Sequence, residues 1–138
     1  MVTNYSDNPQ VPSYQSYALN PDQLIAGPFP EVTLDNSPVI AQSAALKRGS
    51  VLGVITASGK YLLSASAASD GSQNPAAILL DDVDASAADV TGAAVAITGE
   101  FNARKLILGT GTTLAAAIAA LRTHSIFVKQ SVSAADPT

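Results

Sequence analysis

The sequence lacks cysteine and long apolar runs. The absence of cysteine excludes disulfides and thiolate metal sites. No segment approaches the ~20 apolar residues that a membrane-spanning helix needs, so we expect no membrane association. The polar N-terminus MVTNYSDNPQ has neither the basic nor the apolar region of a signal peptide, and we therefore expect synthesis in the cytoplasm.

Charged residues are also scarce, and positive ones most of all. Seven Lys and Arg stand against eleven Asp and Glu, which gives a net charge of −4. A surface that binds nucleic acid needs basic residues to neutralise phosphates, so we expect no direct nucleic-acid binding. Charged residues make up 13% of the chain, about half of the usual ~25%. Such a weakly charged surface is typical of a protein that is covered by its own copies or by a larger assembly.

Proline and tyrosine gather near the N-terminus. Five of the eight prolines occur by Pro30, and three of the four tyrosines occur by Tyr17. Because proline disrupts helices and strand ladders, this part cannot form a compact core by itself. We expect residues 1–30 to form an extended arm and residues 31–138 to form a β-rich domain. The aromatic residues of the arm indicate that it docks onto a partner.

Short apolar segments separated by turn residues predict a mainly β domain. The clearest is a hairpin over 51–66, because Ser58 and Gly59 form a favourable tight turn between two apolar runs. Further strands are expected at 32–34, 38–41, 76–80, 93–99, 106–109 and 125–132. Strands this short and this regularly spaced favour a small barrel or sandwich.

One helix is expected at 113–123. Leu114, Ala117, Ile118 and Leu121 recur at the spacing of a single helical face. Thr112 or Thr113 is the expected N-cap. A helix of this length is marginal alone, so it must pack on the sheet.

The stretch ILLDDVD at 78–84 is the most conspicuous candidate for chemistry. Asp81, Asp82 and Asp84 could bind a divalent cation through carboxylate oxygens. An EF-hand loop that starts at Asp82 would need further ligands, but Ser86 and Ala88 follow and no glutamate closes the loop. We favour a buried strand that ends in a solvated turn, with Asp84 or Ser86 bonded to local backbone amides.

Two other features suggest chemistry less strongly. His124 is the only histidine, and no serine sits in a G-x-S-x-G elbow. The stretch GTGTT at 109–113 lacks the lysine of a phosphate-binding loop. We predict no catalytic, cofactor or metal site and no enzyme activity. The alternative is a small hydrolase that uses Asp82, Asp84 and His124.

Two basic pairs fall in predicted turns. They are Lys47-Arg48 and Arg104-Lys105. Turn tips of this kind are commonly solvated, and either pair could instead contact an acidic surface on a partner.

Two stretches carry a likeness to a known family: LKRGSVLGVITASGKYLLSASAASDGSQNPAAILLDDVDAS and AVAITGEFNARKLILG. In order and spacing they resemble the lambda-type bacteriophage head decoration proteins. The likeness covers about residues 24–132, with the lead-in LIAGPFPEVTL, the closing helix and the IFVK strand. It implies a small β-barrel or β-tulip-like domain with one short helix and an extended N-terminal arm.

The resemblance also implies a function. Members of the family form trimers on the outer surface of the expanded phage head, at local three-fold positions, and clamp neighbouring major capsid subunits against the pressure of packaged DNA. The expected partners are therefore the major capsid protein and two further copies of the chain, with no cofactor, and the expected location is the outer surface of the virion. An alternative is another non-catalytic phage module, such as a tail-tube, fibre-base or spike component.

The resemblance implies that the arm becomes ordered on the shell, where it can extend a sheet of the capsid protein. The expected anchors are the large apolar residues of the arm: Tyr14, Tyr17, Leu24, Ile25 and Phe29.

Overall fold

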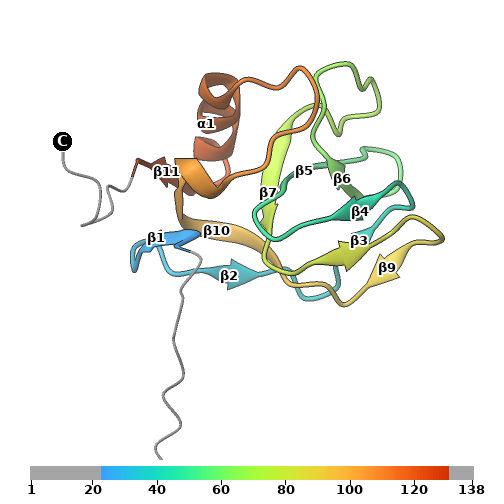
Figure 1. Ribbon diagram of the computed structural model, residues 1–138, viewed down its shortest axis with the longest axis horizontal. Helices are drawn as coiled ribbons and strands as arrows, with labels where there is room; N and C mark the ends of the chain where they lie inside the picture. The colour runs from blue at the N-terminus through green and yellow to red at the C-terminus, as the bar shows by residue number, and fades with distance from the viewer. Residues whose placement is uncertain (1–22, 131–138) are drawn as a thin grey trace, which may run out of the picture.

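The computed structural model describes residues 23–130, which form a mainly β domain. Within this range the chain has eleven strands and one α-helix, and the main sheet curls into a half barrel (Figure 1). The predicted fold class is therefore confirmed. No helix in the range 23–130 is long and apolar enough to cross a membrane.

The elements are short, as the turn-rich sequence predicts. In chain order they are β1 (Ile25–Gly27), β2 (Thr33–Leu34), β3 (Val39–Ile40), β4 (Ala45–Leu46), β5 (Val51–Val54), β6 (Tyr61–Leu63), β7 (Pro75–Leu79), β8 (Val83–Asp84), β9 (Val90–Thr91), β10 (Val95–Asn102), the 3₁₀ turn η2 (Ala103–Lys105), α1 (Leu114–Arg122) and β11 (Ile126–Lys129).

The longest strand, β10, organises the main sheet. The strand order is β1-β10-β7-β5-β6-β3-β9, and β2 and β11 also pair with β10. The first half of β10 lies between β7 and β2, with Ala96 opposite Ile78 and Leu34. The second half lies between β1 and β11, with Phe101 opposite Ile25 on one side. The first and last strands of the described chain thus flank the same part of one strand.

The central strands β5, β7 and β10 are buried on both faces. Successive residues of each strand point to opposite faces, and they fall into two separate apolar clusters. On the first face Leu52, Leu79 and Val95 pack with β3, β6 and the β4–β8 ribbon. The second face carries the cluster of Leu24, Val51, Ile78, Ala96, Phe101, Leu121 and Ile126. A strand buried on both faces reads as a continuous apolar run, which accounts for the AAILL stretch.

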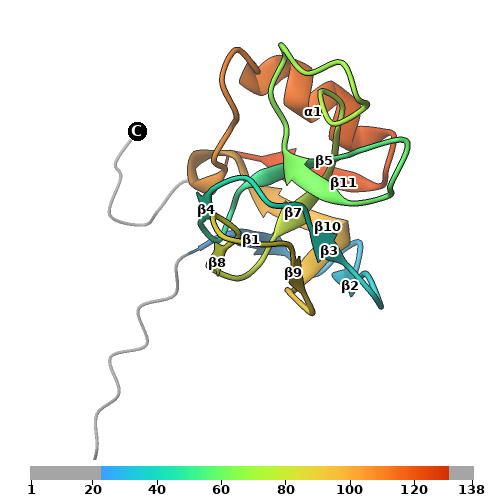
Figure 2. The same cartoon turned by 90° about the vertical axis from the view of Figure 1, so that its right-hand side faces the viewer.

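The single α-helix covers the second face. The Thr113 hydroxyl accepts a hydrogen bond from the Ala116 amide at 3.2 Å, so Thr113 is the N-cap. Leu121 is fully buried against the sheet. The helix also connects β10 to β11, which run parallel and therefore need a crossover between them. Both views place α1 at one end of the molecule and β2 and β9 at the other (Figures 1 and 2).

The predicted hairpin forms, since β5 and β6 pair antiparallel with Gly53 opposite Leu62. Two other segments differ from what the sequence predicts. No strand was predicted within residues 82–92, but this segment contains β8 and β9, and β8 pairs with β4 in a separate two-stranded ribbon. The predicted strand at 106–109 makes only one parallel bridge, between Ile107 and Ser50. This segment follows a 3₁₀ turn and ends at another turn, which leaves room for a single paired residue.

Candidate functional site

The first described residues join the sheet directly. The Leu24 carbonyl accepts a hydrogen bond from the Asn102 amide at 2.8 Å. The Leu24 side chain is 1% exposed and belongs to the second apolar cluster. A partner could therefore contact this side chain only if β1 left β10. Ile25 is 46% exposed and Phe29 is 80% exposed, so both present apolar surface within the first seven described residues.

Of the five expected anchors, Tyr14 and Tyr17 lie outside the described residues. The capsid-binding role of all five stays a prediction, as does the boundary of the arm at residue 30. The structure also shows a feature that was not predicted: residues 25–27 form a strand of the main sheet.

Exposed apolar side chains cluster around β10. Ile25 lies on β1, Leu34 on β2 and Phe127 on β11, and all three strands pair with β10. Phe29 lies in the connection between β1 and β2. Phe127 and Leu34 were not predicted as surface residues, because an alternating strand pattern does not reveal which face is covered.

A buried acid, Glu100, lies on β10. The Glu100 side chain is 8% exposed, and its carboxylate forms an ion pair with Lys129 at 2.7 Å. Lys129 reaches it from the surface, since its own side chain is 65% exposed. Gly27 lies opposite Glu100, and a Cβ at residue 27 would come within 2.7 Å of the Glu100 Oε1 atom. The ion pair thus joins β10 to β11, and the missing Cβ of Gly27 leaves room for the Glu100 carboxylate next to β1.

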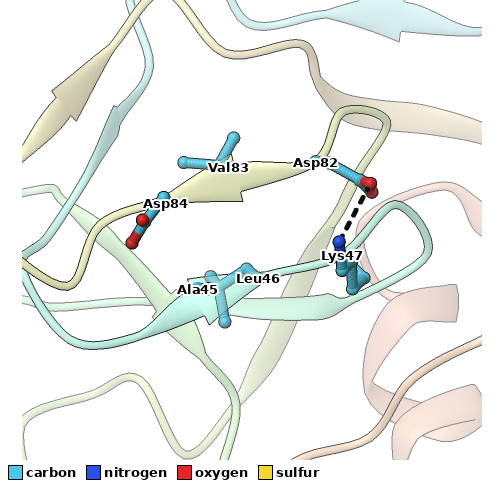
Figure 3. A pocket seen from close by; sticks show the side chains of 6 residues that line it. All are labelled: Ala45, Leu46, Lys47, Asp82, Val83 and Asp84. Carbon is cyan, nitrogen blue, oxygen red and sulfur yellow. Dashed lines mark hydrogen bonds and ion pairs between the residues drawn. The ribbon is translucent and has the colours of Figure 1, made fainter.

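The aspartate stretch forms one side of a shallow open hollow of about 280 Å³ on the β4–β8 ribbon. Figure 3 shows Lys47 and Asp82 pointing toward one another at one end and Asp84 pointing away at the other. The Asp82 carboxylate accepts hydrogen bonds from the Arg48 amide at 2.8 Å and the Lys47 Nζ at 3.3 Å. These two hydrogen bonds, first the one from Arg48, lower the pKa of Asp82.

The other two aspartates have different partners. The Asp84 carboxylate accepts from the hydroxyl of Ser86 at 2.6 Å and from its amide at 3.0 Å, and these bonds lower the pKa of Asp84. This is the local turn that the sequence predicts. Asp81 accepts from the Ala94 amide at 2.8 Å. The three carboxylates thus serve three separate parts of the fold, and within residues 23–130 no group of three acidic, His or Cys side chains could hold a metal ion.

The remaining candidates lie at the end of the helix and in the loop before it. The His124 amide donates to the Leu121 carbonyl at 2.9 Å, directly after the helix. In GTGTT, the Thr112 hydroxyl donates to the Ser64 carbonyl at 2.9 Å. A Cβ at Gly109 would lie 2.1 Å from the same carbonyl oxygen, so glycine allows the loop to approach the 64–66 segment. His124, Asp82 and Asp84 do not form a shared site, because His124 lies beyond α1 and the aspartates lie on the ribbon.

The basic pair Lys47-Arg48 is not a free turn tip. The Arg48 guanidinium donates to the Leu80 carbonyl at 2.7 Å, while Lys47 contacts Asp82. This partner for Asp82 was missed, because Lys47 follows β4 and Asp82 precedes β8, two strands of two residues each that are far apart in the sequence.

One comparison with known proteins identifies a family. A family model for the bacteriophage lambda head decoration protein D matches residues 18–126. The match contains every element from β1 to α1 and ends at the first residue of β11. A comparison with curated proteins found no match.

Proposed function

Since the chain belongs to the bacteriophage lambda head decoration protein D family, its role lies in decorating a phage capsid, and we propose that it does so as a cementing trimer. In this proposal three copies bind the outer surface of the expanded head at local three-fold positions. They join neighbouring subunits of the major capsid protein and stabilise the shell against the pressure of packaged DNA. The observation that supports the proposal most is the family match over residues 18–126.

The physical basis is preferential binding to one state of the shell. A protein that binds the expanded lattice and not the unexpanded one stabilises the expanded state by mass action. Three linked copies also act multivalently, so that weak single contacts combine into tight binding. No catalytic step is needed, and we propose that the protein is not an enzyme.

In this proposal the arm contacts the shell. Residues 1–22 lead directly into β1, which pairs with β10 along one edge. The other edge of β1 has no strand partner among residues 23–130. An added strand would gain main-chain hydrogen bonds that offset the cost of ordering an extended segment. Ile25 and Phe29 are exposed beside this edge and are suited to fill apolar pockets on the capsid protein.

The proposal is tested by co-sedimentation of the protein with expanded and unexpanded heads of the phage that encodes it. We expect saturable binding to expanded heads, no binding to unexpanded heads, and a trimeric mass on the shell. A strict monomer by light scattering that also fails to bind expanded heads would refute the proposal. The proposal concerns the trimer on the shell, and it holds whether the free protein is a monomer or a trimer.

A further inference from the structure

The two basic turns of the sequence lie side by side in the fold. The turn at 46–49 and the segment at 103–107 are joined by backbone hydrogen bonds, because the Ile107 amide donates to the Gly49 carbonyl at 2.9 Å. The Val51 amide in turn donates to the Ile107 carbonyl at 2.9 Å. Segments more than fifty positions apart in the sequence are thus neighbours in the fold. We call their basic residues Lys47, Arg48, Arg104 and Lys105, together with Ile107, the basic patch.

The contact between the turns is close and depends on glycine. Gly49 has a φ of +96°, and a Cβ there would lie 2.4 Å from the Lys105 carbonyl oxygen. The Ser50 hydroxyl also donates to the Lys47 carbonyl at 2.7 Å, which holds the first turn in shape. Hydrogen bonds thus hold the backbone of both turns, which limits the backbone entropy that is lost when a partner binds.

The basic patch concentrates the positive charge of the molecule. It contains four of the seven Lys and Arg of the whole chain: Lys47, Arg48, Arg104 and Lys105. One acid, Asp82, also belongs to this surface, where its carboxylate accepts hydrogen bonds from the Lys47 Nζ and the Arg48 amide. Arg48 is half-buried, and the other three basic residues are exposed. On a chain with a net charge of −4, a patch with an excess of positive charge gives the molecule a strongly asymmetric field.

We infer that the basic patch is a docking surface for a carboxylate-bearing surface of the shell subunit. This inference rests on the proposed function and names a second contact besides the arm. An acidic partner surface attracts the patch and repels the rest of an acidic protein, so it orients the molecule before contact. Ile107, 41% exposed, lies within the patch. An apolar side chain among basic ones matches the mixed chemistry of a protein interface better than a phosphate backbone.

The test compares two charge reversals with the same change in net charge. Lys105→Glu changes the patch, and Arg122→Glu changes an exposed residue at the end of α1. Binding to expanded heads is measured at low and at high salt. We expect Lys105→Glu to weaken binding about tenfold at low salt, with a smaller difference at high salt, because screening removes exposed charge interactions. Arg122→Glu is expected to bind like the wild type.

One further variant and a probe complete the test. Lys105→Gln, which removes charge without adding an acid, is expected to show a smaller loss of the same sign, and thermal unfolding checks that each variant is folded. Equal binding of wild type, Lys105→Glu and Lys105→Gln at low salt would overturn the inference while leaving the proposed function intact. Retention of a labelled DNA duplex by the wild type but not by Lys105→Glu would also overturn it, since the partner would then carry phosphates. A wild-type protein that fails to bind expanded heads at any salt would refute the proposed function, and with it this inference.

Discussion

The central strands β5, β7 and β10 bury an apolar cluster on each face, and the two faces are completed by different parts of the chain. The first face is closed by β3, β6 and the β4–β8 ribbon, all from the interior of the chain. The second is closed by α1, by Leu24 beside β1 and by Ile126 of β11. The second core therefore includes Leu24, a residue of the segment 1–30 that we predict to be the arm. The segment that we propose to meet the shell therefore also contributes to the stability of the domain.

The largest expected effect is on the second face. Phe101→Ala empties a fully buried aromatic site and is expected to lower the free energy of unfolding by about 3–5 kcal/mol. Urea unfolding measures the loss, and Leu52→Ala, a fully buried residue of the first face, is the matched comparison.

Hydrogen exchange distinguishes the two faces. In Phe101→Ala, amides of β1 and β11 are expected to lose more protection than amides of β5 and β6, because local opening follows the packing that was removed. The reverse pattern is expected for Leu52→Ala. A uniform loss of protection in both variants would show that the faces do not open separately.

Gly27→Ala tests how tightly β1 is held against β10. The added methyl would meet the confined Glu100 carboxylate, and overpacking of this kind costs about 1–3 kcal/mol. In a Glu100→Ala background the obstacle is gone, so the same substitution is expected to cost clearly less. Thermal or urea unfolding of the four proteins gives the coupling. An equal cost in both backgrounds would contradict the proposed steric contact.

On the first face, Tyr61 links β6 to the segment before β3. Its hydroxyl donates to the Asp35 carboxylate at 2.8 Å, and Tyr61→Phe is expected to lower the free energy of unfolding by about 1–2 kcal/mol at neutral pH. Burial, followed by the hydrogen bond and the negative charge of Asp35, raises the pKa of Tyr61 to about 12. Urea unfolding of both proteins measures the difference.

The same tyrosine predicts a dependence on alkaline pH. Because the folded pKa lies above the unfolded value of 10.0, the stabilisation is fully present below pH 10 and is lost as pH rises toward about 12. The stability difference between wild type and Tyr61→Phe is therefore expected to shrink over that range. A difference that stays constant up to pH 12 would contradict the raised pKa.

The smallest expected effect on stability belongs to Phe29. It is 80% exposed, so Phe29→Ala is expected to change the free energy of unfolding by less than about 0.5 kcal/mol. Its binding to expanded heads is nevertheless expected to weaken, since the exposed ring is a proposed anchor. Co-sedimentation measures this loss. The same measurement on Ile107→Ala compares it with an exposed apolar residue of the basic patch. Unchanged binding of Phe29→Ala would remove Phe29 from the proposed contact.

Local pattern predicted the parts of the fold that depend on neighbours in sequence. The hairpin over 51–66 and the Thr113 cap follow from turn and capping chemistry within a few residues. The buried strand in ILLDDVD also follows, because Ile78 and Leu79 fill opposite faces of a sheet covered on both sides.

Features that depend on distant residues could not be predicted. The pairing of β4 with β8 joins strands of two residues each, which have no measurable periodicity. The burial of Glu100 depends on Lys129 and Gly27 from two other strands. The burial of Leu24 was hidden by the prolines around it, which gave the whole segment the character of an arm. The basic patch likewise appears only once the fold has joined its two turns.

The most direct test of the account is a reconstruction of the decorated particle by electron microscopy. We predict three copies of the domain around each local three-fold position on the outer surface of the expanded head, with density leading from β1 onto the capsid protein and the basic patch facing the shell. Density on the tail, or no ordered density on the expanded head, would contradict the account.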